Sequence, residues 1–292
     1  MMNHKKHLYY GVNICVAFFS TIFLLKIFID IFTNPSMNIL WQNSVYLLIA
    51  FLCACIVYAL KALRFYLVLM EKRISAYRFY RVYVKTTLVT IVLPFKLGEV
   101  FRAYCYGYEI SDYACSILSV LVDRYFDSIP LVVLIVATML LKGNTLSGVV
   151  MLLLIFIVLS TLAYGVFPSA QKYFNNFLMA NTSSKNGIRM LRLLDIANKW
   201  YTYVYSLIHG RSLLMLVLSC VAWGAEFISL WCISTAFGNL FGFNEFANYL
   251  STAFLGTSGW LSANYLLLGL IIFAALVTII YVSSYIKKRS RK

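Results

Sequence analysis

Residues 94–127 read PFKLGEVFRAYCYGYEISDYACSILSVLVDRYFD, and they concentrate charged side chains in an otherwise apolar chain. The stretch begins with a helix breaker, Pro94, directly behind an apolar segment. Ionised groups in hydrocarbon are costly, so they persist mainly where they pair, line a wet cavity or handle a charged substrate. The sequence therefore indicates that this stretch decides both the helical layout and the function of the chain.

The spacing of these charges is regular. Glu99 and Arg102 are three residues apart, and Asp123 and Asp127 are four apart with Arg124 between them. Side chains at these separations share one face of a helix. Two charged helix faces are therefore predicted to meet.

Composition places the chain in a membrane. Hydrophobic residues make up 62% and charged residues 12% of its 292 residues, and the mean hydropathy is +0.82, whereas soluble proteins are about a quarter charged. The prediction is an all-α, polytopic membrane protein. The net charge of +15 is explained by basic cytoplasmic segments and favours anionic lipid headgroups as partners, with no nucleic acid expected.

Six apolar stretches approach the length of about 20 residues that spans a bilayer. They are residues 9–31, 43–63, 125–141, 147–167, 212–236 and 262–285. Two further stretches, 82–93 and 247–259, are too short or too interrupted to span as ordinary helices. We expect one membrane domain over residues 1–292, with six full transmembrane helices and two short re-entrant or broken helices.

The two short segments lie in opposite halves of the chain. Paired broken segments of opposite orientation mark the binding site in many secondary transporters, so we hypothesise an inverted repeat. The alternative is eight ordinary helices, in which Pro94 only kinks a continuous helix.

Basic residues assign the sides of the membrane. They gather before residue 9, in 64–85, in 169–211 and after residue 286, whereas 32–42, 142–146 and 237–246 contain only Lys142. Both termini are therefore predicted to be cytoplasmic, in a cell membrane. Arg64 belongs to the basic segments on this interpretation, and Lys61 is expected to reach the interface from a span end.

Residues 168–211 form the one long connection between predicted spans. Apolar side chains recur at helical spacing in its second half, opposite charged ones: Met190, Leu194, Ala197, Trp200, Val204 and Leu207. The pattern is typical of an amphipathic helix that lies on the membrane surface. A helix packed on the cytoplasmic face of the protein itself fits the pattern equally well.

Two motifs carry a family resemblance. PFKLGEVFRAY (94–104) and SVLVDRYFD (119–127) resemble the paired signature of the lysylphosphatidylglycerol synthase transmembrane region family, whose members are flippase-like. The resemblance implies movement of lipids or lipid-linked intermediates across a bilayer, with a synthase or glycosyltransferase as an expected partner. The family usually has Glu at the position of Asp123, and often a Pro-Gly-Gly-rich, Glu-containing segment where residues 255–260 here read LGTSGW.

Arg102 and Arg124 are the candidate phosphate ligands, because a guanidinium stays charged and binds phosphate oxygens through two donors. Lys96 adds a point charge behind the break formed by Pro94 and Gly98, and a helix that begins near Leu97 offers free N–H groups. Glu99, Asp123 and Asp127 are expected to orient the arginines. The alternative is a purely structural network of ion pairs.

Glu226 stands in the middle of an apolar span with no basic neighbour in the sequence. It is predicted either to close the substrate site from the second half of the chain, as a proton-coupled or amine-binding group, or to pair with an arginine of residues 94–127. A structural role is the alternative.

These observations favour translocation of an anionic phospholipid or a polyprenyl-phosphate-linked saccharide. One rival is a membrane transferase in which Asp123 and Asp127 hold Mg²⁺. The other is a membrane partner of a synthase that transports nothing. No cofactor and no metal are expected, since the acids form no second cluster.

Overall fold

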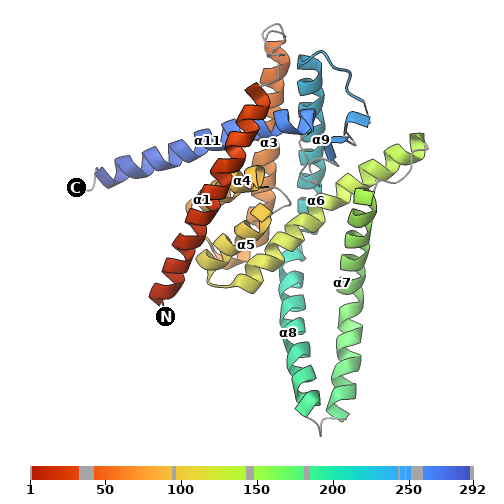
Figure 1. Cartoon of the computed structure of the whole chain (residues 1–292). Coiled ribbons are helices and arrows are strands. Elements are labelled where there is room, and N and C mark those ends of the chain that lie inside the picture. The colour runs from red at the N-terminus through yellow and green to blue at the C-terminus, as the bar shows by residue number, and fades with distance from the viewer. Residues whose placement is uncertain are drawn as a thin grey trace.

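The computed structural model describes residues 2–32, 43–93, 97–142, 148–180, 185–242, 244–246, 248–250 and 259–289. The regular elements in these ranges are helices (Figure 1). They are α1 (Met2–Phe32), α3 (Ser44–Leu69), the short 3₁₀ helix η1 (Met70–Lys72), α4 (Ala76–Val92), α5 (Leu97–Ile110), α6 (Tyr113–Lys142), α7 (Gly148–Ala180), α8 (Lys185–Ile208), α9 (Ser212–Ala236) and α11 (Trp260–Arg289).

Among the described residues, 5 helical stretches are long and apolar enough to cross a membrane. They are His7–Lys26, Ser44–Lys72, Met151–Met179, Ser212–Ala236 and Trp260–Ile280. Each coincides with a span expected from the sequence, so the chain is a polytopic all-α membrane protein. The sixth expected span, 125–141, lies in α6 and is not among these five stretches; the first half of α6 carries Asp123, Arg124 and Asp127.

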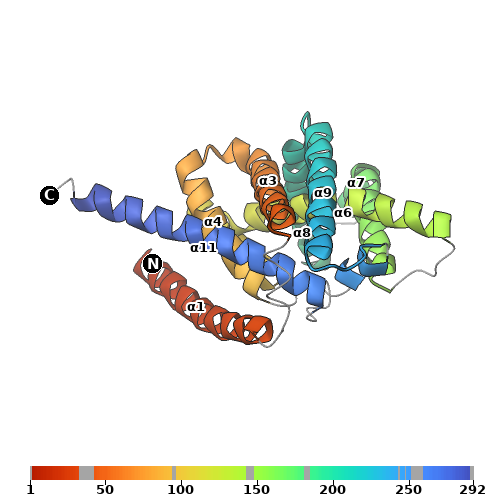
Figure 2. The ribbon, with the colours of Figure 1, turned by 90° about the horizontal axis from the view of Figure 1, so that it is seen from above.

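Helices α3 and α9 lie side by side at the centre of the molecule, and α6 crosses them (Figures 1 and 2). Small residues let the two backbones approach closely. Ala50 and Ala54 on α3 are fully buried, and the Ser229 hydroxyl on α9 donates to the Ala50 carbonyl at 3.0 Å. The α3–α9 pair therefore brings the polar residues of both helices into one interior.

Helices α4 and α5 form an antiparallel hairpin. Leu93 ends α4 in an extended conformation, as expected for a residue before proline. The Tyr106 hydroxyl near the end of α5 donates to the Phe79 carbonyl near the start of α4, at 3.0 Å. The chain thus reverses after residue 93, and the alternative in which Pro94 only kinks a continuous helix is wrong.

Helices α7 and α8 form a second, longer hairpin that extends away from α3 and α9 (Figure 1). The sequence placed the end of a span at residue 167 and a connection from 168 onward. That boundary is wrong, because α7 continues through Pro168 to Ala180. The predicted amphipathic helix is α8, and it packs against α6 and α7.

The second short segment, 247–259, lies mostly outside the described residues, which omit residue 247 and residues 251–258. The inverted repeat therefore stays a prediction.

Candidate functional site

The α4–α5 hairpin carries Glu99 and Arg102 into the interior. Gly98 makes the tight pairing of the two helices possible, because a Cβ atom there would lie 2.2 Å from the Cα atom of Thr90. Pro94 and Lys96 lie outside the described residues, so their expected roles stay predictions.

Arg64 of α3 occupies the centre of the charged cluster. Its side chain is fully buried, and its Nε and Nη1 atoms each donate to an aspartate of α6, Asp123 and Asp127, at 2.7 Å. Nη1 also donates to the hydroxyl of Ser219 on α9 at 2.7 Å. The sequence interpretation of Arg64 as part of a basic cytoplasmic segment is therefore wrong, because its partners come from two other helices.

Arg124 binds the remaining oxygens of the same two aspartates. Its Nη2 donates to Asp123 Oδ2 at 2.7 Å, and its Nη1 donates to Asp127 Oδ2 at 3.2 Å. Nη1 also lies 3.6 Å from Glu99 Oε1. Both aspartates thus bridge two arginines, Arg64 on one side and Arg124 on the other. The two charged faces predicted from the spacing do meet.

Exposure distinguishes the two arginines. The Arg124 side chain is 26% exposed, whereas that of Arg64 is 1% exposed. Each of the two guanidiniums has one buried donor without a hydrogen-bond partner among the described residues, Nη2 of Arg64 and Nε of Arg124. Exposure alone therefore sets Arg124 apart, and its open side is the part that a ligand could contact.

Arg102 is enclosed. Its side chain is 4% exposed, lies 3.5 Å from Glu99 and donates to the hydroxyl of Thr87 at 3.0 Å. Its guanidinium also lies over the rings of Tyr83 and Phe65, 5.1 and 5.7 Å from their centroids. Contacts of this kind stabilise a desolvated cation. Arg102 is therefore placed to support Glu99, and its expected role as a phosphate ligand stays a prediction.

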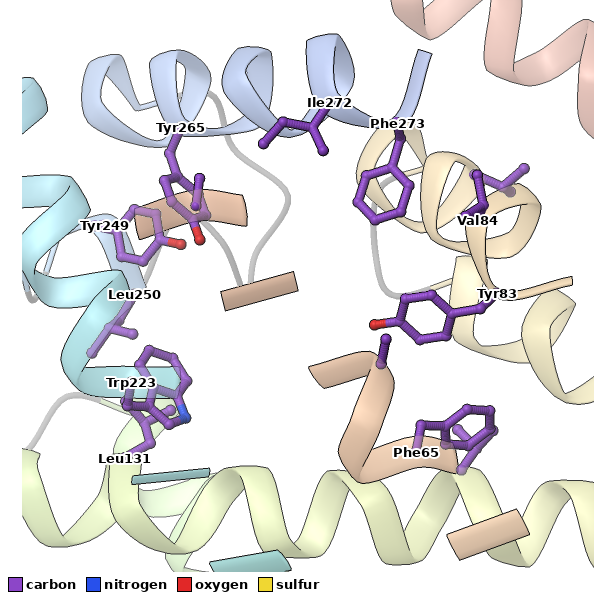
Figure 3. Close-up of a cluster of buried hydrophobic side chains, with 14 of the residues drawn as sticks. Phe65, Tyr83, Val84, Leu131, Trp223, Tyr249, Leu250, Tyr265, Ile272 and Phe273 are labelled. Carbon is purple, nitrogen blue, oxygen red and sulfur yellow. The ribbon is translucent and has the colours of Figure 1, made fainter. Parts of the chain in front are cut away.

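Glu226 on α9 pairs with a lysine. Its Oε2 accepts from Lys61 Nζ at 2.7 Å, and its Oε1 accepts from the Tyr249 hydroxyl at 2.7 Å. This bond contradicts the predicted pairing of Glu226 with an arginine of residues 94–127, and Lys61 turns inward instead of reaching the interface. The expected part of Glu226 in closing the substrate site stays a prediction. In Figure 3, Tyr249 lies beside Tyr265, with Trp223 below them.

Trp223 joins the Lys61–Glu226 pair to the aspartates. Its indole N–H donates to the backbone carbonyl of Asp127 at 2.9 Å, and Lys61 Nζ lies 5.4 Å from the centre of its ring. The Lys61 side chain is 19% exposed. Lys61 and Arg124 are thus the cations of the cluster that are open at one side.

Opposite charges balance within the described part of the cluster. Four cations face four carboxylates: Lys61, Arg64, Arg102 and Arg124, with Glu99, Asp123, Asp127 and Glu226. Because an unpaired charge in the interior is far costlier than a paired one, such a network must be balanced to persist. Sequence reasoning missed Lys61 and Arg64, although their spacing of three residues in an otherwise apolar span was a usable signal.

The sequence model described as Lysylphosphatidylglycerol synthase TM region matches residues 14–262, which cover most of the chain and all of the charged cluster. The chain belongs to this family. As a member of the lysylphosphatidylglycerol synthase transmembrane region family, it is a multi-pass membrane protein involved in lipid handling. No curated protein and no solved structure matches the chain.

Proposed function

We propose that this protein translocates an anionic phospholipid or a polyprenyl-phosphate-linked saccharide across the cytoplasmic membrane. The observation that carries the proposal is the balanced charge cluster buried among candidate membrane spans, which is open at Arg124 and Lys61. A buried network of this kind is a poor stabiliser compared with apolar packing. Its presence is therefore better explained by a charged ligand than by stability.

Arg124 and Lys61 are the proposed contacts for the phosphate group. Arg124 offers a planar guanidinium on a partly exposed side chain, and Lys61 offers a point charge on a flexible stem. Arg124 binds Asp127 directly, and Lys61 lies over the ring of Trp223, whose indole N–H donates to the Asp127 carbonyl. Arg102 and Arg64 do not contact the phosphate in this proposal. They hold the carboxylates that orient Arg124.

The carboxylates hold Arg124 in position while the site is empty. Glu99, Asp123 and Asp127 each lie within 3.6 Å of its guanidinium. An entering phosphate would compete with them for the same donors. Such an exchange gives a weak, reversible site, which suits transport because the substrate must also leave.

The transferase alternative needs free carboxylate oxygens. All four oxygens of Asp123 and Asp127 already accept from Arg64 or Arg124. Within the described ranges, no group of three or more His, Cys, Asp or Glu side chains could hold a metal ion. The geometry therefore favours anion binding over Mg²⁺ chemistry.

The test is Arg124→Lys in purified protein reconstituted into vesicles of phosphatidylcholine and phosphatidylglycerol. Transbilayer movement of fluorescent phosphatidylglycerol, and in a second arm of a fluorescent polyprenyl phosphate, would be followed by chemical quenching from outside. Lysine keeps the charge but loses the two-donor geometry, so we expect translocation to fall about tenfold.

Arg211→Lys is the matched control. Arg211 is 23% exposed and lies 3.5 Å from Glu71, so it is a partly exposed arginine with a carboxylate partner outside the cluster. We expect it to translocate like the wild type. Equal translocation rates for Arg124→Lys and the wild type would show that Arg124 does not bind the phosphate. Wild-type protein that moves neither lipid would favour the role of a non-transporting partner, and chelator-sensitive turnover of a lipid phosphate would favour the transferase.

A further inference from the structure

A groove of about 630 Å³ lies between α6, α7 and α8. Its walls are mainly apolar and rich in aromatic side chains, among them Phe126, Phe156, Tyr164, Phe167, Trp200 and Tyr201. Lys, Arg, His, Asp and Glu are all absent from this lining. The groove therefore has no group that would bind a charged headgroup or a charged peptide.

Two hydroxyls in the lining of the groove, one on α6 and one on α7, bond to each other. The hydroxyls of Tyr125 on α6 and Thr161 on α7 lie 2.8 Å apart and form a hydrogen bond. The Thr161 hydroxyl also lies 2.8 Å from the Ile157 carbonyl. This contact joins two walls of the groove and uses both hydroxyl protons, so neither of these two groups is a free donor.

The size of the groove suits one hydrocarbon chain. A methylene group occupies nearly the volume of a water molecule in the liquid, about 30 Å³. The groove therefore has room for about 20 of them, enough for one acyl chain and too few for a long polyprenyl chain.

The groove is separate from the charged cluster. On α6, the lining residues Leu118, Val122, Tyr125 and Ile129 follow one stripe, whereas Asp123 and Asp127 fall on the other side of the helix. The wall formed by α7 belongs to a candidate membrane span, Met151–Met179, whose side chains are mostly exposed. A groove in such a span opens towards hydrocarbon.

We propose that this groove between α6, α7 and α8 is a binding site for one acyl chain of a bilayer phospholipid. The chain fills the space between the three helices, and it thereby strengthens the packing of the α7–α8 hairpin against α6. The site is independent of the proposed transport function, because it uses none of the charged residues.

The first test fills the groove from inside. Ala163 on α7 and Ala197 on α8 line it, so Ala163→Phe and Ala197→Phe place a ring where the chain would lie. Val158→Phe is the control, because Val158 is 51% exposed on the opposite face of α7. Protein purified in mild detergent would be analysed by native mass spectrometry. We expect the wild type and Val158→Phe to retain one phospholipid per chain, and the two alanine variants to lose it about tenfold, as overpacking predicts.

The second test needs no variant. A phospholipid with a photoactivatable group at the end of one acyl chain would be added to membranes before illumination, and the labelled residues would be mapped by peptide mass spectrometry. Labels on Tyr164, Phe167 or Tyr201 would support the site. Labels confined to outward residues such as Val158, equal phospholipid retention in all variants, a retained isoprenoid or a second copy of the chain bound in place of lipid would each overturn it.

Discussion

At the scale of single residues, the two arginines that share Asp123 and Asp127 differ in their access to water. Arg64 is enclosed by three helices, whereas Arg124 is open on one side. A buried carboxylate that loses its partner keeps the full desolvation cost, while one near an opening can take up water instead. Arg64 and Arg124 bind the same two aspartates, but Arg64 therefore has a structural role and Arg124 faces the ligand.

This difference predicts an order of stabilities. Arg64→Met should lower the free energy of unfolding by about 3–5 kcal/mol, the range for breaking a buried pair. Arg124→Met should lower it by less. Thermal unfolding in detergent, followed by tryptophan fluorescence and size-exclusion chromatography, would measure both.

The double variant Arg64→Met with Asp123→Asn is the control for the Arg64 prediction. The free energy of unfolding of the double variant should be higher than that of Arg64→Met alone, because the second substitution removes one unpaired charge. An Arg64→Met variant with the unfolding temperature of the wild type would contradict the central position of this arginine.

At the scale of elements, the α4–α5 hairpin depends on close contact near its turn. The Cα atom of Thr90 lies where a side chain at Gly98 would begin, and a backbone atom cannot move away by changing rotamer. The helix break itself was predictable, because proline cannot continue α4. The contact between Gly98 and Thr90 was not predictable, because the sequence does not show how closely two helices pack.

Gly98→Ala should therefore destabilise the protein by about 1–3 kcal/mol, as overpacking does. Gly165→Ala on α7 is the matched control, because a Cβ atom there meets nothing within 4 Å. That substitution should be neutral or stabilise by up to about 1 kcal/mol, through the higher helix propensity of alanine. Melting temperatures in one detergent would decide, and equal shifts for both variants would refute a tight α4–α5 contact.

At the scale of the whole molecule, the predicted orientation rests on where basic residues gather. Lys185 begins α8 at the turn of the α7–α8 hairpin, and Asn239 follows the far end of α9 (Figure 1). In a variant whose own cysteines are replaced by serine, a cysteine at Asn239 should react with an impermeant thiol reagent in intact cells. Cysteines at Lys185, Lys5 and Arg291 should be protected, because the positive-inside rule places them in the cytoplasm. Reaction at Lys185 from outside would reverse the topology.

The sequence by itself determined the class of protein, the five helical stretches that are long and apolar enough to span a membrane, the break after α4 and the meeting of the Glu99 and Asp123–Asp127 faces. These features depend on composition and on helical periodicity, which neighbouring residues express directly. The residue at the centre of the cluster required the tertiary structure. Arg64 lies 59 residues from Asp123, and Lys61 lies 165 residues from Glu226. The local sequence around a basic residue near the end of an apolar span is the same whether its side chain reaches the cytoplasm or turns into the protein interior. Only the packing of α3 against α6 and α9 gives these two side chains buried carboxylate partners.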